Sequence, residues 1–513
     1  MALDLRQPIG RPTVGFYALL IVFAALAAGA CGGAPALPSS PAVQVPQEPE
    51  EQAWNPFVVI EPDGRIFMTY YGGRGGNEYQ LLFTRSLDQG LTWLAEPIQL
   101  EKPPLPRTRL GFHRVETNKA GRVSVTWSIE RREETVWRVR ELRHRQSSDF
   151  GMTWTGEVLQ WPFDKQSNYP SPVTGPNGDL SLLFTEGAPG KSVPRFIRIT
   201  GPKMSRTPDP LTLPGADNAA REKPGEPHIR EADWPVLTIE PRGSLYAVWQ
   251  ETRAAGNEIL FNRSQDGGAT WLPSSLLLSR PTSLGNYTGR IPVVAIDGAG
   301  GIYVVWEDFR HNTTDLYFNR SLDGGANWLG QDVWLTAVRP PQAAAASPTL
   351  SADQSGHLYL LWSDIREAPN SLFFTRSLDR GATWLLQPIR VDHHGPEALT
   401  YAHRLAHDDA GHVYVAWWEG TGPTKGSVRF NRSDDYGATW LEKEQILDSG
   451  QGKEGPRFPW LSADGQNGVY VVWSSDRSGR YQLYLNRSRD HGKTWLPKDI
   501  QITGNRDRKK AAS

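Results

Sequence analysis

The chain has 513 residues, and its 55 lysine and arginine residues nearly balance its 56 aspartate and glutamate residues, giving a net charge of −1. This balance argues against a nucleic-acid partner and against attraction to an acidic membrane surface. With 20 tryptophan, 50 glycine and 40 proline residues but only 4 methionines, the composition is typical of short strands joined by tight turns. The single cysteine, Cys31, excludes an intrachain disulfide, so the fold must depend on its apolar core.

The N-terminus predicts an export signal. Arg6 and Arg11 precede an apolar run, VGFYALLIVFAALAAGA, which is too short and too rich in small residues at its end for a typical transmembrane helix. The tetrapeptide AGAC that ends at Cys31 resembles the lipobox of bacterial lipoproteins, although alanine stands where leucine is usual. We therefore expect a lipoprotein-type signal peptide at 1–30 and lipidation of Cys31. An ordinary secretory peptide and an uncleaved anchor are the alternatives.

The proline-rich segment 31–53 is expected to be a flexible linker. Beyond it, an eight-residue motif recurs. Its copies begin at residues 86, 147, 264, 321, 377, 433 and 488 and read SLDQGLTW, SSDFGMTW, SQDGGATW, SLDGGANW, SLDRGATW, SDDYGATW and SRDHGKTW. Their final tryptophans are separated by 61, 117, 57, 56, 56 and 55 positions. Because 117 is about twice the other spacings, one repeat lacks this octet.

A second landmark gives the number of repeats. In each unit an aromatic residue follows a proline or histidine by fourteen positions, and the pairs are Pro56/Tyr70, His113/Trp127, Pro170/Phe184, Pro235/Trp249, Pro292/Trp306, Pro348/Trp362, His403/Trp417 and Pro459/Trp473. These pairs define eight units over residues 54–504. The third unit is the one without an octet.

Each unit predicts four short antiparallel strands. In the fifth unit the runs PVVAI, IYVVW, LYFNRS and DVWLT are separated by turns that contain glycine or aspartate. A four-stranded sheet of this length can bury its two apolar faces only by packing against other such sheets. Stacking the sheets radially around an axis also protects their edge strands. We therefore predict an all-β fold, a β-propeller of about eight four-stranded antiparallel blades over 54–504. Six or seven blades are the alternatives, and 505–513 is expected to be a disordered tail.

The octet is interpreted as a turn and not as an active site. Its aspartate can accept backbone hydrogen bonds, its glycine permits a positive φ, and its tryptophan can bury apolar area between blades. A catalytic acid is needed once, whereas this aspartate occurs seven times, as Asp88, Asp149, Asp266, Asp323, Asp379, Asp435 and Asp490.

The pattern S-x-D-x-G-x-T-W resembles the Asp box, or BNR repeat, of the sialidase-type propellers. The resemblance implies the superfamily and its propeller fold; Asp boxes also occur in propellers with other tasks. The sialidases proper have six blades, which differs from the eight units counted here.

The resemblance also implies a set of site residues. Sialidases use an Arg-Ile-Pro arginine and two further arginines on the substrate carboxylate, an aspartic acid as proton donor, and a tyrosine nucleophile activated by a glutamate. Arg290 begins an Arg-Ile-Pro sequence, and Asp315 lies twenty-five residues later as the acid. Arg457, Tyr401 and Asp233 occupy the same register in other units; we assign Arg457 and Asp233 to substrate binding and Tyr401 to catalysis. The third arginine stays open among Arg404, Arg114, Arg109 and Arg230, and the glutamate between Glu397 and Glu454.

Histidines concentrate in the segment VDHHGPEALTYAHRLAHDDAGH, at 393, 394, 403, 407 and 412. Their spacing fits no metal-ligand pattern that we can name, so we interpret the segment as a solvated loop, with a metal site as the alternative, and expect no metal and no cofactor.

These observations favour an exported, lipid-anchored propeller that binds a glycan or protein ligand at the mouth of its central channel. We expect a monomer in the bacterial cell envelope, on its periplasmic or extracellular face, held to the membrane by the lipid alone. The alternative is an exo-sialidase-like glycoside hydrolase acting on carboxylated sugars of the sialic-acid type. A third reading is an assembly factor whose blades dock a partner protein.

Overall fold

The computed structural model describes most of the chain between residues 52 and 504. The described ranges are 52–75, 78–102, 107–118, 120–133, 136–155, 158–175, 178–188, 191–200, 210–215, 231–253, 256–281, 287–338, 343–365, 370–395, 397–421, 426–448 and 455–504. The predicted signal peptide, Cys31, nearly all of the linker and the tail lie outside these ranges. The described ranges hold no helix of the length and hydropathy that a membrane crossing requires.

The described residues form strands and no helix, as the composition predicts. The first half contains β1 (Gln52–Ile60), β2 (Ile66–Gly75), β3 (Glu78–Ser86), β4 (Ile98–Glu101), β5 (Thr108–Thr117), β6 (Val123–Glu133), β7 (Val136–Ser147), β8 (Leu159–Thr174), β9 (Leu180–Gly187), β10 (Val193–Ile199), β11 (Leu211–Thr212), β12 (Glu231–Ile239), β13 (Leu245–Arg253), β14 (Gly256–Ser264) and β15 (Leu276–Leu277).

The second half repeats one pattern of strand lengths. It contains β16 (Tyr287–Ile296), β17 (Ile302–Asp308), β18 (Asp315–Ser321), β19 (Val333–Trp334), β20 (Ala345–Ala352), β21 (Leu358–Asp364), β22 (Ser371–Ser377), β23 (Ile389–Arg390), β24 (Leu399–His407), β25 (Val413–Gly420), β26 (Gly426–Ser433), β27 (Gln445–Ile446), β28 (Pro456–Ala463), β29 (Val469–Ser475), β30 (Gln482–Ser488) and β31 (Ile500–Gln501).

Hydrogen bonds group these strands into six sheets, four of which are simple four-stranded meanders. The other two each join two successive repeats. In the first, the sixteen-residue strand β8 pairs with β7 through its beginning and with β9 through its end. In the second, β14 and β16 form a short parallel ladder at Gly256–Tyr287 and Asn257–Thr288.

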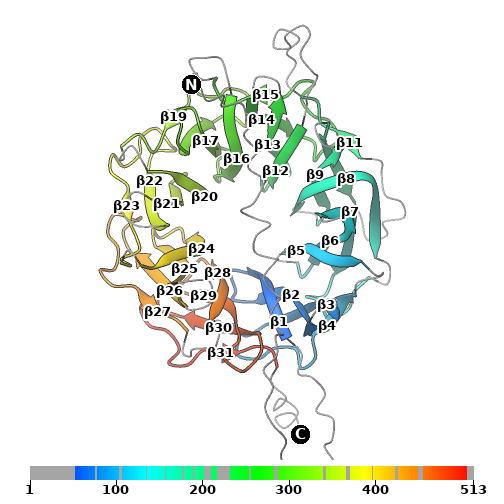
Figure 1. The fold of residues 1–513 in the computed structure, drawn as a ribbon, viewed down its shortest axis with the longest axis vertical. Helices are drawn as coiled ribbons and strands as arrows, with labels where there is room; N and C mark the ends of the chain where they lie inside the picture. Colours follow the sequence, from blue (N-terminus) through cyan, green and yellow to red (C-terminus); the bar gives the residue numbers. More distant parts are fainter. Residues whose placement is uncertain are drawn as a thin grey trace, which may run out of the picture.

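The sheets stand in a ring with the first strand of each repeat innermost (Figure 1). These first strands are β1, β5, β8, β12, β16, β20, β24 and β28, and each contacts the next one around the whole ring, including β28 with β1. The first and last described repeats meet: the Ala53 N–H of β1 donates a hydrogen bond to the Tyr481 carbonyl at 2.7 Å. Val58 and Ile66 also share an apolar cluster with Tyr470 and Leu483. The all-β, propeller-like part of the prediction is confirmed.

The core lies between neighbouring sheets. The second-strand aromatic landmarks include six tryptophans without exposed surface: Trp127, Trp249, Trp306, Trp362, Trp417 and Trp473. Trp306 of β17, for example, clusters with Ile259 and Phe261 of the preceding repeat. Truncating a buried tryptophan to alanine typically costs about 3–5 kcal/mol, so these contacts bind each sheet to its neighbour.

The octet forms a turn that docks onto the preceding sheet. Asp266 Oδ1 accepts hydrogen bonds from Ser264 Oγ at 2.7 Å and the Thr270 N–H at 2.8 Å, and Oδ2 accepts one from Thr270 Oγ1 at 2.6 Å. Gly268 has a φ of +94°, and a Cβ there would lie 2.4 Å from the Phe196 ring. Glycine is therefore required both by the backbone and by the close approach.

Removal of the Asp266 carboxylate tests its structural role. We expect Asp266→Ala to lower the free energy of unfolding by about 1 kcal/mol near neutral pH, because exposed charged acceptors contribute less than buried ones. The Thr270 hydrogen bonds lower the pKa of Asp266 to about 2, below its usual 3.8. The stabilisation is thus complete above pH 3.8 and is lost as the pH falls toward 2. Urea unfolding should show the gap between variant and wild type closing over that interval; a pH-independent gap would contradict this role.

Candidate functional site

Every first strand carries a β-bulge at its proline or histidine landmark. The ladder to the second strand skips between Trp54/Phe57, Leu110/His113, Asn168/Ser171, Asp233/Val236, Arg290/Val293, Ala346/Thr349, Tyr401/Arg404 and Arg457/Trp460. Proline has no N–H for a ladder, which suits the irregularity in six of the units, and the two units with histidine at this position carry the same bulge. The bulges place the unrepeated side chains of the first strands at matching levels around the inside of the ring.

Arg290 is held by its own sheet. Its Nε lies 3.0 Å from Glu307 Oε2, and its guanidinium sits 4.2 Å from the centre of the Phe309 ring. Burial raises the pKa of Glu307, and Arg290 counteracts this. The arginine side chain keeps 37% of its surface exposed, so it can still meet a ligand.

Asp315 has no exposed surface. Its Oδ1 accepts a hydrogen bond from Thr336 Oγ1 at 2.8 Å, between the third and fourth strands of its repeat. Gln482 makes the same contact in the last repeat, where Thr503 Oγ1 donates to its side-chain oxygen at 2.6 Å. The equivalent contacts of Asp315 and Gln482 support a structural role for this position, where it ties the third strand to the residues after the fourth.

The other predicted residues lie on the inner strands in two pairs. Tyr401, which is 41% exposed, lies on β24 next to the β28 strand of Arg457, and its ring packs 5.6 Å from the ring of Trp418 on β25. Asp233 lies on β12, next to the β16 strand of Arg290, and burial together with Glu231 raises the pKa of Asp233 to about 7. The strands β20 and β24 stand between β16 and β28 in the ring, so the structure does not bring Arg290 and Arg457 onto neighbouring strands.

Four residues, each directly after the landmark of its own unit, contact one another in a row, which the sequence analysis did not predict. Arg404 lies over the Trp460 ring at 5.0 Å, Trp460 packs on Phe57 at 4.4 Å, and Arg114 lies over Phe57 at 5.7 Å. We call these four residues the arginine–aromatic arc. They come from the adjoining first strands β24, β28, β1 and β5, and each is partly exposed.

The arginines of the arc have the chemistry that an acidic ligand requires. Arg404 Nη1 donates a hydrogen bond to the His403 carbonyl at 2.9 Å. Arg114 Nε lies 3.4 Å from Glu116 Oε1, and the Arg114 side chain is 36% exposed. The planar fork of a guanidinium matches the geometry of a carboxylate or sulfate.

The same level on the other four first strands is small and uncharged. It carries Ser171, Val236, Val293 and Thr349. The ring is therefore asymmetric at this level, with two charges and two large aromatic rings on one half. Reading the residue after each landmark in all eight units would have revealed this contrast, although Arg404 and Arg114 were among the arginines left open.

The histidine landmarks connect neighbouring repeats beside the arc. His403 Nε2 donates to the Ser347 carbonyl at 2.9 Å, and His113 Nε2 donates to the Asn55 carbonyl at 3.0 Å. Burial lowers the pKa of both histidines to about 4. The interpretation of 391–412 as a solvated loop is wrong, because Leu399–His407 is the strand β24 and His403 within it is buried. Arg230 and Glu454 lie outside the described residues.

Comparisons with known proteins give distant likenesses. Neither a protein-family model nor a curated protein matches the chain. Among solved structures, a protein of unknown function from Dyadobacter fermentans is 16% identical over 75% of this chain and 99% of its own, with a TM-score of 0.40. A Hadza microbial sialidase is 14% identical over 65% and 70%, with a TM-score of 0.35. An ulvan lyase is 10% identical over 85% and 94%, with a TM-score of 0.45. These likenesses assign no activity to this chain.

The His403 contact generates a pH prediction. We expect His403→Pro, which introduces the residue found at this position in six other repeats, to cost about 1 kcal/mol at pH 7 through the lost hydrogen bond. The pKa of His403 is about 4 in the folded state, against an ordinary value of 6.5. The unfolded chain therefore binds a proton that the folded chain does not, and the wild type loses stability as the pH falls from 6.5 to 4. The variant lacks this cost, so its deficit in chemical unfolding should shrink over that range.

Thr349→Ala provides the control, because it changes an uncharged side chain of β20, the first strand next to β24, and should leave this pH dependence as in the wild type. A His403→Pro deficit that stays constant from pH 7 to pH 4 would show that His403 is not held neutral in the fold.

Proposed function

We propose that the protein is an exported, lipid-anchored, eight-bladed propeller of the Asp-box type that binds an acidic glycan on the arginine–aromatic arc. The anchor is Cys31, released by cleavage after residue 30, and the segment 31–53 tethers the ring to the membrane of a bacterial cell envelope. The protein acts there as a monomer and without a nucleic-acid partner. The eight blades follow the eight first strands, with the two joined sheets each counted as two blades.

The observation that carries this proposal is the order of side chains in the arc. The Phe57 and Trp460 rings form a joint apolar surface, and the apolar face of a sugar ring packs well on such a surface. Arg404 and Arg114 flank it on either side and suit the carboxylate or sulfate groups of an acidic sugar. Aromatic and arginine side chains are also the residue types that dominate binding energy at interfaces.

Binding without hydrolysis agrees best with the geometry. The sialidase reading needs an exposed acid and converging arginines, whereas Asp315 is buried and Arg290 and Arg457 come from strands that are not neighbours. One observation favours the glycosidase alternative. Asp233, with a pKa of about 7, would be protonated often enough at neutral pH to donate a proton to a leaving group.

Binding of a defined oligogalacturonate tests the arc. We expect Trp460→Ala and Arg404→Ala each to weaken binding about tenfold or more, because loss of a central contact costs more than about 1.4 kcal/mol. The Arg404→Ala variant should also show a weaker dependence of affinity on salt. Isothermal titration calorimetry measures both effects.

The controls come from the opposite half of the ring. Thr349→Ala and Val293→Ala change the same level of the first strands and should bind as the wild type does. An equal loss in Thr349→Ala, or equal affinity for an uncharged maltooligosaccharide, would refute an acidic-glycan site on the arc. Release of free sialic acid from sialyllactose by the wild type and its loss in Asp233→Asn would instead establish the glycosidase.

A further inference from the structure

A second group of side chains on the ring lies at the turns between first and second strands. In the last four repeats an aspartate opens this turn, and its carboxylate accepts a hydrogen bond from a tyrosine six residues later. The pairs are Asp297–Tyr303, Asp353–Tyr359, Asp408–Tyr414 and Asp464–Tyr470, at 2.6–3.3 Å. These four carboxylates are buried, so each of them needs partners for its charge.

The following repeat supplies a side chain to three of these turns, always from the fourth position of its octet. Arg380 lies 2.8 Å from Asp297 and neutralises it. Tyr436 packs edge-on against His357 at 5.1 Å, beside Asp353. At the third turn the same position is His491, whose Nδ1 lies 3.4 Å from Asp408 Oδ2.

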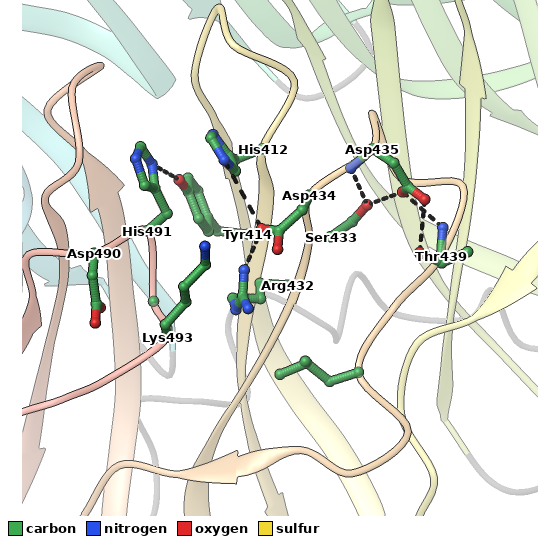
Figure 2. Close-up of polar contacts among 12 residues, drawn as sticks. His412, Tyr414, Arg432, Ser433, Asp434, Asp435, Thr439, Asp490, His491 and Lys493 are labelled. Atoms are coloured by element: carbon green, nitrogen blue, oxygen red, sulfur yellow. Dashed lines mark hydrogen bonds and ion pairs between the residues drawn. The ribbon is translucent and has the colours of Figure 1, made fainter.

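The third turn therefore gathers a buried carboxylate and two imidazoles. His412 Nδ1 lies 2.8 Å from Asp408 Oδ2, and the rings of His412 and His491 stack at 4.0 Å. Figure 2 shows His412, Tyr414 and His491 gathered at one place, with Asp434 and Arg432 beside them. One ligand atom from each of Asp408, His412 and His491 lies within 4.8 Å of the other two. We call these three residues the His–Asp cluster.

We propose that the His–Asp cluster binds a divalent transition-metal ion, with zinc as the best fit, and that this ion joins the last two repeats. Two imidazole nitrogens and one carboxylate oxygen form a ligand set that zinc accepts, and water completes a tetrahedron. At bond lengths of about 2.0–2.1 Å, neighbouring ligands of a tetrahedral zinc lie about 3.3–3.4 Å apart. The Asp408–His491 separation of 3.4 Å already has this value, and the Asp408–His412 hydrogen bond must open by about half an ångström.

The comparison among repeats supports metal binding at the third turn, beyond the contacts that stabilise the turn itself. An aspartate–histidine pair four residues apart also occurs as Asp353–His357, at 2.7 Å, so that pair belongs to the turn. What distinguishes the third turn is His491. It occupies the octet position that is Arg380 at the first turn, where the arginine supplies the positive charge that pairs with Asp297. A metal ion would supply the positive charge at Asp408. The histidine-rich segment 391–412 could not reveal this site by itself, because it contains only Asp408 and His412 and the third ligand, His491, lies 79 residues beyond His412.

The repeats also provide matched variants that the fold already accepts. His491→Tyr gives the third turn the same residues as the Asp353, His357 and Tyr436 turn. Conversely, Tyr436→His gives the second turn the ligand set of the third. His393→Gln removes an exposed histidine elsewhere and serves as the control.

Zinc is the probe. The untagged full-length chain is stripped with a chelator and titrated with ZnCl2, with bound metal counted after dialysis and the unfolding midpoint followed in parallel. We expect the wild type and His393→Gln to bind one zinc at this site and to gain thermal stability from it. His491→Tyr should lose that zinc or bind it at least about 10–100-fold more weakly.

Gain of one additional zinc by Tyr436→His would support the same ligand set independently. The proposal is overturned if His491→Tyr binds as much zinc, with as much stabilisation, as the wild type. It is equally overturned if the wild type binds no zinc at micromolar concentrations. Neither measurement involves a glycan, so the result for the zinc site is independent of whether the proposed glycan binding is correct.

Discussion

The whole structure depends on the packing of one sheet against the next. Each sheet has two apolar faces, and a short sheet without a neighbour on both sides would leave one of them in water. In the absence of helices among the described residues, and with a single cysteine in the sequence, this contact is what holds the described fold together. The ring is the arrangement that satisfies every sheet, and it requires that the first strand β1 meet the last repeat. The shared cluster around Val58 and Tyr470 meets that requirement.

This constraint decides where function can lie. The buried tryptophans of six second strands and the seven octet turns recur because they pack one repeat against the next. They cannot vary without loss of stability. The first strands are freer, since their bulges lift side chains out of the regular ladder at a fixed level around the ring. At that level the side chains vary from Arg404 and Trp460 on one side to Val293 and Thr349 on the other, and all four are partly exposed.

The repeated features were the ones that the sequence could predict. Seven copies of an octet and eight landmark pairs indicated strands, turns and tryptophan contacts between neighbouring repeats, because each of these features recurs with the period of the repeat. The full burial of the second-strand tryptophans was not part of that prediction. Features that depend on a particular partner were not predictable. The spacing between Arg290 and Asp315 resembles a catalytic pair, but the third strand turns Asp315 into the core beside Thr336. Likewise β8 continues without a break from one repeat into the next, and the spacing of the octets and landmarks did not predict this.

The central claim is that the protein binds an acidic glycan on one half of its inner ring. A crystal structure of the protein with a bound oligogalacturonate tests this claim most directly. Our account predicts a sugar ring against Phe57 and Trp460, with its carboxylates at Arg404 and Arg114. A saccharide bound instead between Asp233 and Arg290, with the arc unoccupied, would contradict the account and favour the glycosidase alternative.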